Sequence, residues 1–262
     1  MRQAMGAVIR KDLRAITANK RLLIPMLAVP LVLTVFVPSI FLLVLHFMPE
    51  ETGDMQRLLQ LLPDSLREGS LEQLAVNTLM NYIMPVFFLV IPIMASSIMA
   101  ASSFVGEKEK HTLETLLYSP LSLGQIFQAK VLASFCMSML VSFLSFGAML
   151  LVVEGEAFGL LGILLVPAPS WLAVLFLVSP GLTLLAVTLI VRGSAKAQTV
   201  EEAQQGAVFL VLPVLLLLVG QFTGFLLVSL WILLGLGAAL LLLGVALLKR
   251  SLGRWQYERL LQ

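Results

Sequence analysis

The chain has 262 residues, of which 59% are hydrophobic and only 12% are charged, and its mean hydropathy is +1.00. Soluble domains carry about 25% charged residues, so this composition excludes a protein whose whole surface faces water. The formal net charge of +2 gives no indication of a nucleic-acid partner. Because each membrane crossing needs about 20 apolar residues, we expect an all-α integral membrane protein with several spans.

The first 21 residues are predicted to form an amphipathic helix. Apolar residues recur at helical spacing with cations between them: Met5, Ile9, Leu13 and Ile16, with Arg10, Lys11 and Arg14. Such a helix lies along the inner membrane surface, with its cations near anionic lipid. A basic tail that only directs membrane topology is the alternative interpretation.

Six apolar stretches follow that are long enough to be considered as spans. They are Leu22–Phe47, Leu79–Phe104, Ile126–Val153, Trp171–Val191, Gln204–Gly220 and Phe225–Leu248. The last two are divided only by "GQFTG", where Gly220 and Gly224 permit a tight reversal of the chain. The fifth stretch is short, so it either crosses fully or forms a re-entrant hairpin with the sixth.

The distribution of Lys and Arg predicts the orientation of the spans. Of the 17 such residues, 15 lie in the N-terminal segment, the C-terminal tail, or the connections between spans two and three and between spans four and five. Only Arg57 and Arg67 lie on the other side of the membrane, in the loop at 48–78. Lys130 is assigned to the connection between the second and third spans, so no charged residue is expected inside a span. Positive residues concentrate on the cytoplasmic side, so we expect both termini in the cytoplasm and the protein in the cell membrane.

The loop at 48–78 is the only sizeable extracytoplasmic segment in this topology. It is predicted to form one or two short helices, since "SLEQ" at Ser70–Gln73 has the spacing of a capping box. A single cysteine, Cys136, excludes an intramolecular disulfide and is interpreted as a packing residue. Neither His46 nor His111 has a second ligand at metal-binding spacing, so no metal site is expected.

Four serines lie on one face of the third span, because their spacings of 4, 4 and 3 follow the helical repeat. They are Ser134, Ser138, Ser142 and Ser145. One interpretation is a seam of small residues that lets helices pack closely. The other is a polar stripe that lines a transport pathway.

A charged segment at 105–121 separates the second and third spans. It contains "GEKEKHTLETLLYSPLS", in which three leucines share one helical face and Pro120 ends the helix. "SLGQ" at Ser122–Gln125 has capping-box spacing and would start the third span. A short helix with a leucine stripe needs a partner surface or the lipid headgroup region, and a solvated helix that touches lipid is the alternative.

This stretch is similar to the cytoplasmic signature of type-2 ABC exporter permeases. The matching positions are Gly106, Glu107, Lys108, Glu109, Thr112, Leu113, Glu114, Leu116, Leu117, Pro120 and Ser122. The family's usual glycine before the threonine is His111 here. The resemblance implies that residues 105–121 form a coupling helix, which docks into a groove on a separate ATP-hydrolysing subunit.

Two further stretches resemble the same family. "VIRKDLRAITANKRLL" looks like its N-terminal interfacial helix, and "KAQTVEEAQQGA" at Lys196–Ala207 looks like a cytoplasmic loop of the sodium-exporter-like branch. The resemblance makes Glu201, Glu202 and Gln204 a second cytoplasmic contact. Glu201 replaces the usual lysine and the outer loop is much shorter, so the substrate stays open among lipid, peptide antibiotic, drug and sodium.

The resemblance implies a single permease domain over residues 1–262. It would form an export pathway with a second permease copy or homologue, contact membrane lipid, and bind two ABC ATPase subunits. The chain has no Gly-x-x-x-x-Gly-Lys-(Ser/Thr) phosphate loop. ATP and Mg²⁺ are therefore expected on the ATPase, and no catalytic residue, cofactor or metal is expected in this chain.

Two other classes of protein share part of this pattern. Glu201 and Glu202 resemble the paired glutamates of membrane CAAX-type proteases, but those enzymes need a following arginine and downstream histidines, and both histidines here lie upstream. A noncatalytic membrane scaffold or sensor is the main alternative. It predicts that no ATPase partner exists.

Overall fold

Every regular element in the described part of the chain is helical. The computed structural model describes residues 2–47, 71–109, 121–162, 164–194, 197–222 and 230–257. Six of its helical stretches are long and apolar enough to cross a membrane: Lys20–Phe47, Glu72–Glu109, Leu123–Leu161, Ser170–Gly193, Val200–Gly220 and Leu230–Ser251. The all-helical class and the six predicted spans are confirmed, and the fifth span has the length to cross by itself. The predicted capping box at Ser70 lies outside the described residues.

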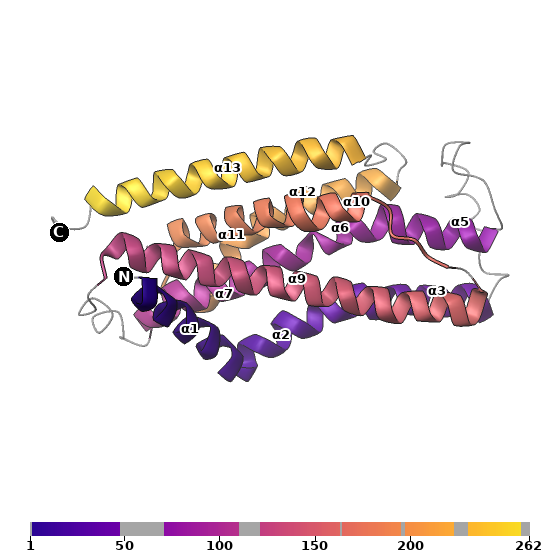
Figure 1. The fold of residues 1–262 in the computed structure, drawn as a ribbon, viewed down its shortest axis with the longest axis horizontal. Coiled ribbons are helices and arrows are strands. Elements are labelled where there is room, and N and C mark those ends of the chain that lie inside the picture. The colour runs from indigo at the N-terminus through magenta and orange to yellow at the C-terminus, as the bar shows by residue number, and fades with distance from the viewer. Residues whose placement is uncertain are drawn as a thin grey trace.

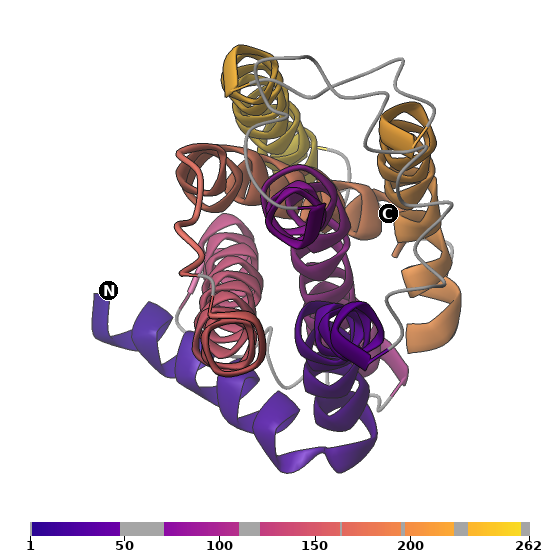
Figure 2. The same ribbon diagram turned by 90° about the vertical axis from the view of Figure 1, so that its right-hand side faces the viewer.

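The chain begins with α1 (Arg2–Ala18), which runs across one end of the bundle and meets α2 (Lys20–Leu31) at a sharp corner (Figures 1 and 2). Asn19 makes this corner. Its backbone is extended, and its side chain accepts a hydrogen bond from the backbone N–H of Arg21 at 3.2 Å. An N-cap of this kind starts α2 in a new direction. We call this end of the bundle the α1 end.

Three spans contain a π-helical turn at a proline. The first span comprises α2, η1 (Val32–Phe36) and α3 (Val37–Phe47), and the second comprises α5 (Leu71–Thr78), η4 (Leu79–Ile83), α6 (Met84–Phe88) and α7 (Val90–Glu109). The fourth comprises α10 (Ser170–Ala173), η5 (Val174–Val178) and α11 (Ser179–Gly193). Pro38, Pro85 and Pro180 each follow a π turn by two residues. Because a proline lacks an N–H and clashes with the preceding turn, the wider turn relieves the contact.

The third span, α9 (Leu123–Leu161), is 39 residues long and continues well past the predicted end at Val153. At 1.5 Å per residue it measures about 58 Å, whereas a bilayer core is about 30 Å thick. Gly162 ends the helix in the left-handed conformation, with φ of 66°. A helix so much longer than the bilayer core can hold charged residues beyond the lipid, and Glu154 and Glu156 lie within α9, near its end at Leu161.

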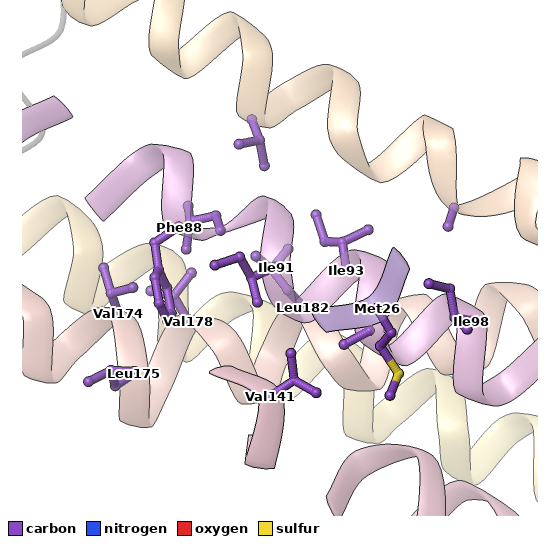
Figure 3. Packing of buried hydrophobic residues seen from close by; sticks show 14 of the residues in the cluster. Met26, Phe88, Ile91, Ile93, Ile98, Val141, Val174, Leu175, Val178 and Leu182 are labelled. Atoms are coloured by element: carbon purple, nitrogen blue, oxygen red, sulfur yellow. The ribbon is translucent and has the colours of Figure 1, made fainter. Parts of the chain in front are cut away.

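The second and fourth spans form the centre of the bundle. In their most apolar stretches 78% and 72% of residues are buried, against 22% in the first and fifth spans and 17% in the sixth. Phe88 of α6 packs edge-on against Trp171 of α10, with ring centroids 5.4 Å apart. Figure 3 shows Phe88 and Ile91 facing Val174 and Val178 across this centre. The outer spans therefore present their apolar surface to lipid or to another protein.

The last two helices are α12 (Val200–Phe222) and α13 (Leu230–Tyr257). α13 packs on the fourth span (η5 and α11) through three glycines. A Cβ atom at Gly181 would lie 2.8 Å from Leu240 Cβ and 2.9 Å from the backbone nitrogen of Leu241. A Cβ at Gly237 would lie 2.8 Å from Leu177 of η5, and one at Gly244 would lie 2.8 Å from Leu184 of α11. Small residues let membrane helices approach in this way.

Cys136 was interpreted as a packing residue, and this interpretation is wrong. Its side chain is exposed on the outer surface of α9. The same outward surface is apolar elsewhere, with Leu140 and Leu144 on α9 also exposed. A cysteine is apolar enough for such a surface, so an apolar run does not tell which of its residues face inward.

Candidate functional site

The predicted coupling segment is joined to the α1 end of the bundle. Its first positions, Gly106 to Glu109, form the last turn of α7. Thr112, Leu113, Glu114, Leu116, Leu117 and Pro120 lie outside the described residues. Just beyond, Ser122 caps α9: its hydroxyl accepts from the Gln125 N–H at 3.3 Å, and the Gln125 side chain accepts from the Ser122 N–H at 3.0 Å. This capping box was predicted and is confirmed.

One side of this last turn holds the second predicted cytoplasmic segment. Lys108 Nζ donates to the backbone carbonyl of Ala197 at 3.0 Å, and the backbone N–H of Val200 donates to Glu109 Oε2 at 3.4 Å. Gly106 lies beside Val200, whose Cγ2 would be 3.7 Å from a Cβ at that glycine. Residues far apart in the sequence, Gly106–Glu109 and 197–200, therefore form one surface.

The three residues predicted as a second contact lie in the first turns of α12. Glu201 is exposed and Gln204 is partly buried. Glu202 helps to cap its own helix, because its Oε2 accepts from the Gln198 N–H at 2.7 Å and its N–H donates to Thr199 Oγ1 at 3.2 Å. The Thr-x-x-Glu spacing at 199–202 is the sequence signal for this cap, and our sequence analysis missed it.

The other side of the α7 end holds a cluster of charged residues that the sequence analysis did not predict. Lys130 was assigned to a loop, and this assignment is wrong: it lies in the second turn of α9 and is only 3% exposed. Its Nζ is 2.9 Å from Glu107 Oε2 and 3.7 Å from Asp12 Oδ2. The expectation that no charged residue lies inside a predicted span is wrong at this position.

Further contacts close the cluster. Ser103 Oγ donates to Asp12 Oδ2 at 2.6 Å, and Lys130 Nζ donates to the Ser103 carbonyl. Lys11, which is about half exposed, pairs with the other carboxylate oxygen of Glu107. A buried charge is tolerated only when it is paired and hydrogen-bonded, and each buried member of this cluster meets that condition.

The four predicted pathway serines lie in the interior of the bundle. All are at most 2% exposed. Ser134 and Ser145 donate to carbonyls of their own helix, at 2.9 and 2.8 Å, whereas Ser138 donates to the Pro92 carbonyl at 2.9 Å and lies 3.0 Å from Thr183 Oγ1. The hydroxyl of Ser142 has no hydrogen-bond partner among the described residues. Ser138 thus joins α9 to α7 and α11.

A comparison with models of known protein families identifies the family to which the chain belongs. A family model described as ABC-2 type transporter matches residues 3–220, which is most of the chain and includes the first five spans. A comparison with curated proteins finds no match. The matched domain is of the permease type and is not an ATPase. The chain therefore belongs to the ABC-2 type transporter family, and it is a multi-pass transmembrane subunit of an ABC transporter.

Proposed function

We propose that the chain is the transmembrane subunit of an ATP-driven exporter of the type-2 class. Two permease copies form the translocation pathway, and two separate ATPase subunits dock on the cytoplasmic segment at 105–121. Members of this family pair with ABC ATPases in general, which is the basis for the partner. The transported substrate is left open. The branch of the family to which the chain belongs, including the sodium-exporter-like branch, is left open as well.

The observation that carries this proposal is the fixed base of the coupling segment. The last turn of α7 is hydrogen-bonded on one side to residues 197–200 and ion-paired on the other side to α1 and α9. At the far end, the capping box at Ser122 fixes the start of α9. A segment held at both ends transmits the motion of a docked subunit with little loss.

The proposed docking acts through the leucine stripe and the acidic residues of the segment. Leu113 and Leu117 fill a groove on the ATPase, and Glu114 pairs with a cation at its rim. A few fully desolvated residues near the centre of an interface supply most of its affinity, and burying an unpaired charge is costly, so introducing charges here opposes docking directly.

Co-purification with the cognate ATPase tests the proposal. Leu113→Asp combined with Glu114→Arg is expected to abolish co-purification and the stimulation of ATP hydrolysis by the permease. The control is Glu72→Arg, a charge reversal at an exposed position on α5 at the opposite end, which should leave both unchanged. If the double variant retains the ATPase and its turnover, the segment is not the docking site.

A further inference from the structure

Only three charged side chains are buried in the described part of the chain, and all three belong to the cluster at the α1 end. They are Asp12 at 5% exposure, Glu107 at 7% and Lys130 at 3%. They come from α1, α7 and α9, and the last two of these helices lead directly into and out of the coupling segment. The burial of charge is thus concentrated at the base of that segment.

Lys130 is the member that joins the three helices. It reaches the carboxylates of both Glu107 and Asp12, at 2.9 and 3.7 Å, and its Nζ also lies 5.5 Å from the centre of the Phe104 ring. Ser103 closes the group, since it donates to Asp12 and its carbonyl accepts from Lys130. Without Lys130, α9 would have no ionic contact with either acid.

The charges of the cluster balance. Asp12 and Glu107 are acids, and Lys130 and Lys11 are bases, so the cluster is formally neutral. A buried ion pair adds little net stability compared with apolar side chains of similar size, but losing one partner is costly. An apolar contact would serve folding as well. The ionic contacts additionally fix the positions of the three helices relative to one another.

We propose that Lys130 is a positioning residue that fixes α1 and the acidic base of the coupling segment to the start of α9. The three elements then move as one body when the ATPase subunits act on the segment. This role rests on the proposed function, because it concerns the transmission of ATP-driven motion.

The first part of the test uses the purified chain without an ATPase. Ile16 lies one turn after Asp12 on α1 and is 1% exposed, so Ile16→Cys, in a background with Cys136→Ser, reports whether α1 stays packed. Lys130→Met leaves two buried carboxylates with one half-exposed cation and is expected to raise the maleimide reaction rate at position 16 roughly tenfold or more. Arg192→Gln is the control, because this cation bonds Ser251 of α13. Equal rates in Lys130→Met and the control overturn the proposal.

The second part uses the complex with its ATPase in liposomes. Met80→Cys, in the same Cys136→Ser background, is a buried position toward the opposite end, 6% exposed. It reports ATP-driven motion as a change in maleimide reactivity on addition of ATP and vanadate. We expect Lys130→Met to lose this change while ATP hydrolysis continues. Lys130→Met with Asp12→Asn is again neutral, because Glu107 keeps its pair with Lys11, and it should regain the thermal midpoint of the unmodified chain but not the ATP-driven change.

The outcomes separate the two proposals. If the unmodified complex shows no ATP-driven change at position 80, the proposed exporter function is wrong, and the role of Lys130 falls with it. If the unmodified complex responds and Lys130→Met responds equally, only the role of Lys130 is wrong. If the neutral pair regains both stability and response, the cluster acts through stability alone, and the positioning role is also overturned.

Discussion

At the scale of single residues, Gly181 is one of three described glycines at which an added Cβ would lie only 2.8 Å from a neighbouring atom. A Cβ there would lie 2.8 to 3.0 Å from Leu240 and the backbone of Leu241, neither of which can move without shifting α13. Gly181→Ala is therefore expected to lower the free energy of unfolding by about 1–3 kcal/mol. Thermal unfolding of the purified protein in detergent micelles would measure the loss.

Gly235 provides the matched control for this substitution. It lies on α13, and nothing approaches within 4 Å of the place where its Cβ would stand. Gly235→Ala should be neutral or slightly stabilising, because alanine favours the helix. If both alanine variants unfold at the same temperature, α11 and α13 do not pack through Gly181.

The ionic cluster shows where residue-level prediction from the sequence stops. Asp12 and Lys130 are 118 positions apart, so their pairing depends on how α1 crosses the bundle, and no local pattern encodes that crossing. A signal for Lys130 did exist. A lysine in an apolar helix, two turns after its cap, is itself a reason to expect a buried partner.

At the scale of elements, the π turn η4 explains a hydrogen bond of Trp171. The backbone N–H of Met84 donates to the Leu79 carbonyl across this turn, and the next donor in the pattern would be residue 85. That residue is a proline and has no N–H. The indole Nε1 of Trp171 donates to the Met80 carbonyl instead, at 3.0 Å, so a side chain from another span replaces the missing backbone donor.

Trp171→Phe tests whether the indole hydrogen bond to the Met80 carbonyl stabilises the fold. The variant leaves the buried Met80 carbonyl without its donor, so we expect a loss of about 1–3 kcal/mol in the free energy of unfolding. Trp231→Phe is the control, because Trp231 is 80% exposed. Equal stabilities of the two variants, measured by unfolding in detergent, would contradict this account of the π turn.

Among the elements, the spans were predicted well and their ends less well. Six apolar stretches became six long helices because lipid leaves the backbone few other ways to satisfy its hydrogen bonds. The third span was predicted to end at Val153 because charged residues follow. The helix continues to Leu161, since a charge ends a membrane core and does not end a helix.

At the scale of the whole molecule, the predicted orientation puts the α1 end in the cytoplasm. Single cysteines at Glu201 and at Glu72, both exposed, test it in a background with Cys136→Ser. A membrane-impermeant maleimide applied to intact cells should label position 72, and should label position 201 only after lysis. Labelling of position 201 in intact cells would reverse the topology and remove the coupling segment from any cytoplasmic ATPase.

The overall class was predictable from the sequence, whereas the contacts that build the candidate site were not. Composition alone indicates a membrane protein, and the motif at 106–122 indicates which connection matters. The contacts that hold this motif come from Lys11, Ala197 and Val200, which lie in other parts of the sequence. Tertiary packing chooses such partners, and a single sequence does not record it.

The unbroken length of α9 has a mechanical consequence. The helix runs for 39 residues from the Ser122 cap to Gly162 without a proline or a π turn, unlike the first, second and fourth spans. A straight rod of about 58 Å that tilts by about 10° around its midpoint displaces each tip by roughly 5 Å in opposite directions. A displacement of α9 at one face of the membrane is thus transmitted to the other face without loss. The neighbouring spans accommodate this motion by bending at their π turns.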